Sequence, residues 1–351
     1  MRILVIGGTG FIGHFLVPHL VEHGHAVTVY HRGHAEPALA ASVGHILDDR
    51  NDLGSHLPEF QRLSPDVVID MILSSERQAR TLMETFRGIA GRVVALSSQD
   101  VYRACGILHG LEPGPLQALP LTEDSELRTR LKTYGPETIR TLQKIFPWLD
   151  DEYDKIPVER AVLGDLRLAG TVVRLPMVFG PGDPLHRFFP TIKRIDDGRT
   201  AILLQEDAAR WRAPRGYVEN VAAAIALAGT SSKSADRIYN LGEPEAFSEL
   251  EWAQKIGRAA GWQGSVLAVP TDRTPAHLRV PFRNEQHWVV STARVRRELG
   301  FAEPVALDAA IERTIAWERA NPPAEIDPKQ FDYAAEDSVL ADLKRMPAGA
   351  T

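Results

Sequence analysis

Short apolar runs alternate with amphipathic stretches through the first half of the chain. The run Ile3–Ile6 predicts a buried strand, and apolar residues at helical spacing over Phe11–His23 predict a helix that ends at Gly24. Five later runs of the same character predict strands at Ala26–Tyr30, Val43–Leu47, Val67–Ile72, Arg92–Ser97 and Gly170–Leu175. Strands and helices that alternate in this way predict the α/β class, with a doubly wound parallel sheet covered on both faces.

The second half of the chain predicts a smaller set of elements. Three helices are expected there, at Pro190–Asp196, Glu249–Ala260 and Leu307–Arg319. Residues 109–148 are rich in Pro, Gly and charge, which predicts a long excursion over the face where the strands end. The expected division is a sheet domain at residues 1–178, a smaller α/β substrate lobe mainly at 179–320 with some segments returning to the sheet domain, and a Pro-rich tail at 321–351.

Composition is that of an ordinary globular protein. The 351 residues are 44% apolar and 25% charged, and the net charge of −6 disfavours a basic surface, so we expect no nucleic-acid partner. The single cysteine, Cys105, excludes an intramolecular disulfide and a cysteine-rich metal site, and no metal site is predicted. Glycines interrupt the amino-terminal apolar run, and no segment reaches the length of a membrane span. A cytoplasmic protein without membrane contact is therefore expected.

A glycine motif, GGTGFIG, follows the first predicted strand and opens the first helix. In this position Gly7 allows a tight turn, Gly10 lets the backbone approach a pyrophosphate, and Gly13 lets the helix pack close to the strand. The amino terminus of the helix also favours negative charge. The motif therefore predicts a Rossmann domain that binds NAD or NADP through Gly7, Gly10, Phe11, Ile12 and Gly13.

The end of the second strand distinguishes the two dinucleotides. An acidic residue there accepts hydrogen bonds from the ribose hydroxyls of NAD, whereas an arginine binds the additional phosphate of NADP. The sequence at this point reads YHRG and has no carboxylate, so Arg32 favours NADP over NAD, against the alternative of a solvated arginine in a turn. Asp49, after the third strand, is expected to accept a hydrogen bond from the adenine amino group or to cap the turn.

Three further segments occur in a fixed order after the glycine motif: LSSQDVY at 96–102, RLPMVFGPGD at 174–183 and RGYVENVA at 215–222. With GGTGFIG, they resemble the extended short-chain dehydrogenase/reductases, the group that contains the NAD-dependent epimerases and dehydratases of sugar nucleotides. The resemblance covers the chain through Glu318. It implies that Ser98, four positions before Tyr102, is catalytic, and it suggests a homodimer.

The catalytic pair departs from the pattern of that family, in which a Tyr lies four positions before a Lys and a Glu commonly four positions after it. Lys155 and Glu159 keep the second spacing, so Lys155 corresponds to the lysine of the family and Asp151 occupies the tyrosine position. Tyr153 lies only two positions before Lys155. On one regular helix, two such residues face opposite ways.

The helix start offers a role for Tyr153. Asp154 is a good helix cap and Pro157 belongs in a first turn, so the helix is expected to begin at Lys155, with Tyr153 in the preceding loop. Its hydroxyl could then reach the nicotinamide, while Lys155 lowers the pKa of the tyrosine and holds the ribose hydroxyls. The alternative is that Tyr153 packs beneath the excursion. The candidate catalytic residues are Ser98, Tyr153 and Lys155.

Four residues are candidate contacts of a substrate: Asp100, Tyr102, His186 and Arg215. Asp100 stands where dehydratases of the family place an acid, although its neighbour Gln99 cannot complete an acidic pair. His186 begins a basic stretch that would receive an anionic substrate, such as a nucleotide diphosphate, or form a solvated helix face. Tyr102 and Arg215 belong to the second and fourth of the family segments.

The function implied is an NAD(P)-dependent oxidoreductase, or an epimerase or dehydratase-like enzyme, acting by hydride transfer at a hydroxyl or keto carbon of a small molecule such as a sugar nucleotide. The alternative is a nucleotide-binding regulator or RNA-binding protein on the same fold, because relatives with altered catalytic pairs have such roles. The acidic net charge disfavours RNA, and the presence of both Ser98 and Lys155 favours the enzyme.

Overall fold

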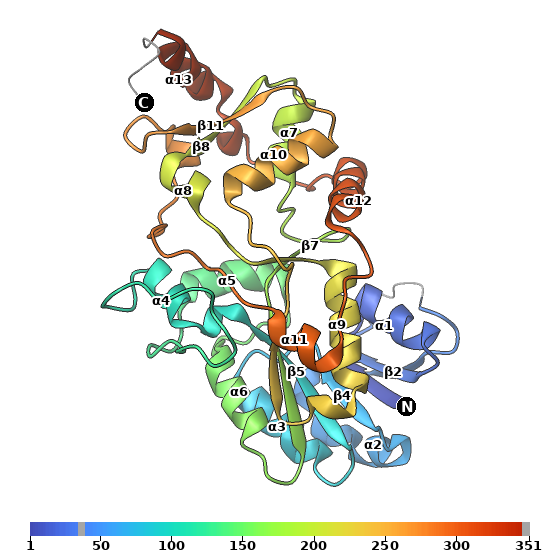
Figure 1. Cartoon of the computed structure of the whole chain (residues 1–351). Coiled ribbons are helices and arrows are strands. Elements are labelled where there is room, and N and C mark those ends of the chain that lie inside the picture. Colours follow the sequence, from blue (N-terminus) through green and yellow to red (C-terminus); the bar gives the residue numbers. More distant parts are fainter. Residues whose placement is uncertain (34–38, 346–351) are drawn as a thin grey trace.

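A parallel sheet of seven strands forms the centre of the larger half of the protein (Figure 1). The computed structural model describes residues 1–33 and 39–345. The strand order is β10-β6-β5-β4-β1-β2-β3, and every neighbouring pair is parallel. The strands are β1 (Arg2–Ile6), β2 (Ala26–His31), β3 (Gly44–Leu47), β4 (Val67–Asp70), β5 (Arg92–Ser98), β6 (Ala169–Leu175) and β10 (Arg237–Asn240). This order confirms the predicted doubly wound α/β fold, and its six predicted strands are present.

Both faces of the sheet are buried by helices. In β1, Val5 contributes to one hydrophobic core and Leu4 to the other, as expected where successive side chains of a strand point to opposite faces. One face is covered by α1 (Gly13–Glu22) and α9 (Val218–Thr230). The other face is covered by α2 (Leu57–Leu63), α3 (Glu76–Phe86) and α6 (Lys155–Leu163). The apolar runs of the sequence therefore correspond to strands of a sheet that helices cover on both faces.

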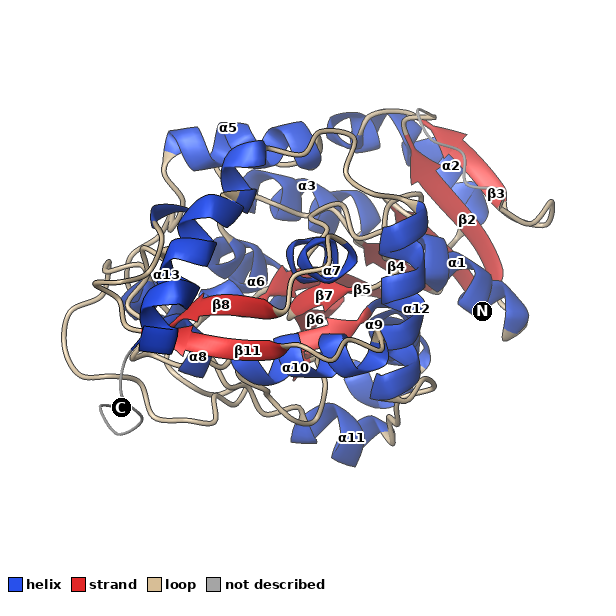
Figure 2. Ribbon diagram, turned by 90° about the horizontal axis from the view of Figure 1, so that it is seen from above, coloured by secondary structure: helices blue, strands red, loops and turns tan. Residues whose placement is uncertain are grey.

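A smaller lobe lies above the carboxyl ends of the strands (Figure 1). In it, β8 (Ala201–Gln205) and β11 (Ser265–Val269) pair in parallel, beside the helices α7 and α10 (Figure 2). A second short pair, β7 (Met177–Phe179) with β9 (Arg215–Tyr217), joins the two halves. Besides α9, the α-helices between residues 179 and 320 are α7 (Phe189–Asp196), α8 (Glu206–Arg210), α10 (Glu249–Ala259), α11 (Ala293–Leu299) and α12 (Leu307–Ala320). No helix of residues 1–33 and 39–345 is long and apolar enough to cross a membrane.

The end of the chain carries a helix that the sequence analysis did not predict. Three prolines of the expected tail, Pro322, Pro323 and Pro328, precede α13 (Tyr333–Arg345), which contains none and packs on the smaller lobe. Its Glu336 is fully buried, accepts a hydrogen bond from Arg194 at 2.7 Å and lies 3.0 Å from His277 Nε2. The sequence analysis expected a Pro-rich tail at 321–351 and did not predict this helix within it. Residues 346–351 lie outside the described part of the chain.

The predicted excursion leaves the sheet domain after β5. It includes α4 (Arg103–Leu108) and, after a long irregular stretch, α5 (Pro136–Ile145). Leu121 pairs with Val290, so the excursion also contacts the segment that leads back from the smaller lobe. From α5, residues 146–154 return the chain to α6 at the edge of the sheet where the strands end.

Candidate cofactor pocket and active site

A pocket of about 660 Å³ opens at the carboxyl ends of the strands. Its walls come from the loop after β1, the end of β2, the turn after β3, the start of α3 and the segment between α5 and α6. In an open parallel sheet, this crevice is where a ligand is expected.

The glycine loop forms the floor of this pocket. Gly7 has φ of +80°, which a residue with a side chain rarely adopts, and a Cβ atom on Gly13 would lie 2.4 Å from the carbonyl oxygen of Gly8. A Cβ atom on Gly10 would meet nothing within 4 Å, and Gly10 lines the pocket together with Phe11 and Ile12. The loop thus presents bare backbone to the cavity, which fits a pyrophosphate group.

The end of β2 and the turn after β3 form the next wall. Arg32 is exposed at the pocket, beside Gly33. Asp49 caps the 3-10 helix η1 (Arg50–His56), since its carboxylate accepts hydrogen bonds from the backbone N–H and the side-chain amide of Asn51 at 2.9 and 2.8 Å. The capping role considered for Asp49 is therefore present, and the residue also lines the pocket.

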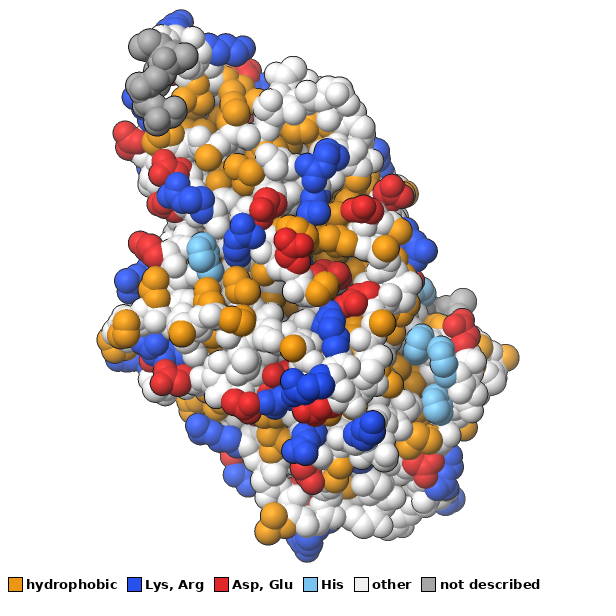
Figure 3. All heavy atoms as spheres, in the orientation of Figure 1, with side chains coloured by type: hydrophobic (Ala, Val, Ile, Leu, Met, Phe, Trp, Pro, Cys, Tyr) orange, Lys and Arg blue, Asp and Glu red, His pale blue; other side chains and the backbone are white. Residues whose placement is uncertain are grey.

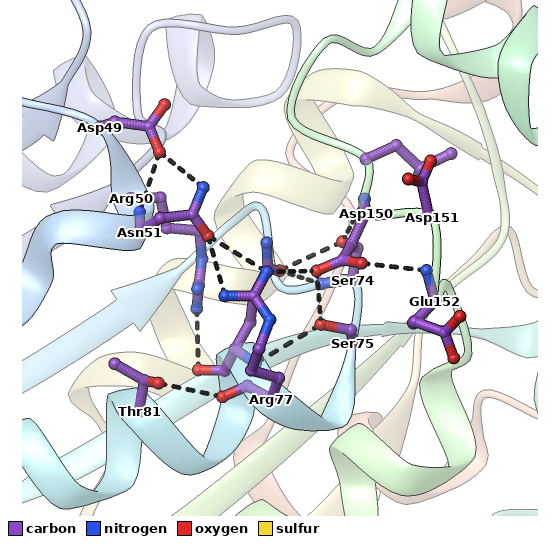
Figure 4. A network of polar contacts seen from close by, with 12 residues as sticks. Asp49, Arg50, Asn51, Ser74, Ser75, Arg77, Thr81, Asp150, Asp151 and Glu152 are labelled. Carbon is purple, nitrogen blue, oxygen red and sulfur yellow. Dashed lines mark hydrogen bonds and ion pairs between the residues drawn. The ribbon is translucent and has the colours of Figure 1, made fainter.

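Residues 143–151, which we call the roof segment, cover the pocket from the side of α5. Asp150 fastens this segment to the start of α3 (Figure 4). Its backbone N–H donates to the Ser74 hydroxyl at 2.8 Å, and its carboxylate accepts hydrogen bonds from Ser75 at 2.9 Å and from Arg77 at 2.8 Å. Burial raises the pKa of Asp150, but hydrogen bonds to its carboxylate outweigh burial and hold that pKa below its ordinary value. The sequence analysis placed residues 109–148 over this face of the sheet but assigned no binding role to residues 143–151.

The hydrogen bonds of Asp150 should hold the roof segment over a bound dinucleotide. We expect Asp150→Ala to weaken NADH binding roughly three- to tenfold, mainly through faster release, because the roof loses its hydrogen bonds to Ser75 and Arg77. Stopped-flow fluorescence of bound NADH would measure the release rate. Glu76→Ala, which removes an exposed ion pair with Arg80 on the same helix, is the matched control and should leave release unchanged. Equal release rates in the two variants would contradict the role of the roof.

The start of α6 places Tyr153 as predicted. Helix α6 begins at Lys155, and its cap Asp154 accepts a hydrogen bond from the backbone N–H of Ile156 at 2.8 Å. Tyr153 consequently lies in the loop before the helix, where its hydroxyl donates to Asp100 Oδ2 at 2.9 Å. The rule that places residues two apart on opposite helix faces does not apply to it.

Ser98 and Asp100 reach the same point from the end of β5. Ser98 caps the 3-10 helix η2 (Gln99–Val101), because its hydroxyl accepts a hydrogen bond from the backbone N–H of Asp100 at 3.1 Å. The structure therefore brings together three residues that the sequence analysis singled out separately. Ser98, Asp100 and Tyr153 form an oxygen cluster, although none of the three lines the pocket itself.

Lys155 is buried next to this cluster. Its ammonium group donates hydrogen bonds to the backbone carbonyl oxygens of Leu73 and Leu96, the latter at 3.0 Å, and lies 5.6 Å from the centre of the Tyr153 ring. Burial lowers the pKa of Lys155 to about 8. Glu159, one turn further along, instead accepts hydrogen bonds from Ser97 and Arg174. Lys155 thus connects α6 to the segment after β4 and to β5, and Glu159 belongs to a buried ion pair.

The other predicted substrate contacts lie in different surroundings. Tyr102 is fully buried and donates a hydrogen bond to Asn240 at 2.7 Å. Arg215 is paired with Glu249 at 2.6 Å, and the His186 ring nitrogen lies 2.7 Å from Glu318. None of Tyr102, His186 and Arg215 lines the pocket. Residues 1–33 and 39–345 also contain no group of three or more His, Cys, Asp or Glu side chains that could hold a metal ion.

Residues 3–104 match the family model of the NAD dependent epimerase/dehydratase family. The chain is 24% identical over 279 residues to a 2'-dehydrokanamycin reductase from Streptomyces kanamyceticus, covering 78% of this chain and 70% of the relative. It is 23% identical over 345 residues to a UDP-N-acetyl-alpha-D-glucosaminuronate decarboxylase from Bacillus cytotoxicus, covering 91% and 98%. The structure of dTDP-glucose 4,6-dehydratase from Bacillus anthracis in complex with NAD has a similar fold, with a TM-score of 0.65 at 13% identity over 91% of this chain and 96% of that one.

Proposed function

We propose that the protein, whose residues 3–104 match the family model of the NAD dependent epimerase/dehydratase family, is an NAD(P)-dependent enzyme acting on a hydroxyl or keto carbon. We assign a sugar nucleotide as the substrate class, because the names of the decarboxylase from Bacillus cytotoxicus and the dehydratase from Bacillus anthracis each include one. The observation that carries the proposal has two parts. The backbone of the glycine loop faces the pocket, and Lys155, next to the oxygen cluster, lies 5.9 Å from the ring of Trp148 in the pocket wall. A nucleotide-binding regulator would need the glycine loop but not the oxygen cluster.

The chemistry divides between the bound group and the side chains. A nicotinamide nucleotide, when bound, accepts or supplies the hydride. Gly10 leaves room for its diphosphate. Lys155 donates two of its three N–H bonds to backbone carbonyls, and we assign the third, which has no acceptor among the described residues, to a ribose hydroxyl. Ser98 and Tyr153 polarise the substrate oxygen and move its proton. Residues of the roof segment would contact the bound dinucleotide from one side of the pocket.

The proposal is tested by incubating the protein with NAD⁺ or NADP⁺ and each of three sugar nucleotides, UDP-glucose, UDP-glucuronic acid and dTDP-glucose. Reduced nicotinamide is followed by absorbance, and sugar products by mass spectrometry and NMR, which also detect an epimer formed with the cofactor recycled. Formation of a product that depends on the dinucleotide is the expected result. A protein that binds neither NADH nor NADPH would contradict the proposal.

The choice of dinucleotide gives a prediction at Arg32. Arg32→Ala should weaken NADPH binding by at least about tenfold and NADH binding far less, because only NADPH has a 2'-phosphate for the guanidinium to bind. Fluorescence titration with each reduced dinucleotide measures both affinities. Arg62→Ala, at an exposed arginine of α2, is the control. Equal losses for NADPH and NADH would remove the basis for preferring NADP.

The alternative function of an RNA-binding protein on this fold is less well supported. Acidic and basic side chains are interspersed on the face seen in Figure 3, and the net charge is −6. A salt titration of RNA binding beside the NAD(P)H titration separates the two functions, since binding to phosphates weakens steeply with salt. The homodimer and the cytoplasmic location stay predictions from the sequence.

A further inference from the structure

Asp100 is a buried carboxylate whose surroundings distinguish it from an ordinary ion-pair partner. Its side chain lies in η2 and is 2% exposed. Oδ2 accepts a hydrogen bond from Tyr153 at 2.9 Å and a longer one from Tyr134 at 3.5 Å, while Oδ1 has no partner within the described part of the chain. Tyr134 comes from the predicted excursion and was not singled out by the sequence. The side-chain hydrogen bonds to this carboxylate therefore come from two neutral phenol groups.

The nearby cations are directed elsewhere. Arg128 donates through Nε to the backbone carbonyl of Asp100 at 2.6 Å, and its guanidinium pairs with Asp154 at 3.3 Å. Lys155 donates to two backbone carbonyls. Cys105, also buried against this region, carries no charge because burial raises the pKa of its thiol. Burial raises the pKa of Asp100 more than the charges of Arg128 and Lys155 lower it, so the carboxylate retains a high affinity for a proton.

Tyr153 is correspondingly poor at holding a negative charge. Burial and the neighbouring charge of Asp100 raise the pKa of Tyr153 well above its ordinary value, although the Ser98 hydroxyl opposes this. The ammonium of Lys155, which would stabilise a tyrosinate, is held by the carbonyls of Leu73 and Leu96. A proton taken up by the Tyr153 oxygen therefore needs a second acceptor behind it.

We propose that Asp100 is this acceptor, acting through Tyr153, and that Tyr134 adjusts its proton affinity. The inference rests on the proposed function. As a substrate hydroxyl gives its proton to the Tyr153 oxygen, the original Tyr153 O–H bond breaks and that proton passes to Asp100 Oδ2. The carbinol C–H bond breaks with its electron pair, and the hydride goes to the oxidised nicotinamide. The substrate becomes a carbonyl, Tyr153 stays neutral and Asp100 becomes neutral; reduction runs through the same steps in reverse.

Asp100 touches no substrate in this scheme, so it is a positioning residue that stores a proton. The protonation of its carboxylate can be measured directly. Infrared difference spectra of the wild type against Asp100→Asn, recorded over pH, isolate the carbonyl stretch of the protonated Asp100. We expect this band to persist above the ordinary pH range of an aspartic acid. Tyr153→Phe and Tyr134→Phe should each shift its midpoint to higher pH, because each removes a donor that stabilises the ionised form.

Kinetics supply the second measurement. With a sugar nucleotide that the wild type oxidises, the rate should fall as pH drops through the pKa of Asp100, since only the ionised carboxylate accepts a proton. Asp100→Asn should slow turnover roughly hundredfold or more and lose this limb of the profile, with NADH affinity unchanged. Tyr134→Phe should move the limb to higher pH, a shift that a purely structural role does not produce.

The outcomes separate the relay from the proposed function. If none of the sugar nucleotides turns over in the wild type, the assigned substrate class fails, while the infrared titration still decides about Asp100. A carboxylate that stays ionised down to the ordinary range, or a midpoint that does not respond to Tyr153→Phe, overturns the relay. So does an Asp100→Asn variant that remains folded and keeps the turnover and pH profile of the wild type.

Discussion

Gly10→Val is expected to abolish binding of NADH and NADPH, weakening it at least about hundredfold, in a protein that still folds. The space beside the Gly10 Cα is open cavity, so a branched side chain meets no protein atom at its Cβ but occupies the volume that the pyrophosphate needs. Folding is expected to survive for the same reason. Fluorescence titration measures the affinity, and thermal unfolding monitored by circular dichroism measures the stability.

A second glycine provides the control for this result. Gly54, in η1, also has open space at its Cβ position and does not line the pocket. Gly54→Val should therefore bind both dinucleotides as the wild type does. If Gly10→Val is folded and binds NAD(P)H as tightly as Gly54→Val does, the glycine loop is not the pyrophosphate site.

Tyr153→Phe is expected to reduce turnover roughly hundred- to ten-thousandfold while NADH affinity stays within about threefold. The loop position of Tyr153 brings its hydroxyl to Asp100 and Ser98, whereas the residue does not line the dinucleotide pocket. Removal of one oxygen therefore interrupts proton transfer and leaves the cofactor site intact. Steady-state kinetics with an identified sugar nucleotide, beside NADH titration, give the two quantities.

Tyr239→Phe is the matched control, because the Tyr239 hydroxyl also donates to a carboxylate, that of Glu298 at 3.2 Å, between β10 and α11. It should retain wild-type turnover. Unchanged turnover in Tyr153→Phe would assign proton transfer to another group, and a common loss in both variants would indicate a general effect of removing a buried hydroxyl.

Features that depend on residues close in sequence could be predicted. The glycine loop and the six strands follow from short motifs and apolar runs, and the start of α6 follows from a cap at Asp154 and a proline in its first turn. The two strands of the smaller lobe were missed, although β8 and β11 are apolar, because an apolar run of five residues does not by itself distinguish a strand from a buried helix.

The arrangement of the candidate site depends on contacts between distant parts of the chain. Tyr153 and Asp100 are 53 positions apart, and no spacing rule predicts their hydrogen bond. Tyr134 of the excursion contacts Asp100, and Asp150 of the roof segment contacts α3. Both contacts depend on how distant segments pack, which the sequence pattern does not reveal. Tyr102 belongs to a family segment, but sequence could not reveal that its side chain is fully buried.

The most direct test of the central claim is a crystal structure of the protein with NADP⁺ and, separately, with NAD⁺. We expect the pyrophosphate against the backbone of Gly10, the adenosine end beside Arg32, and the nicotinamide ring directed toward the hydroxyls of Ser98 and Tyr153. C4 of that ring should then face the space next to the Tyr153 hydroxyl, where a substrate carbon would lie. A dinucleotide bound outside the glycine loop, or one whose nicotinamide ring points away from Ser98 and Tyr153, would contradict the account.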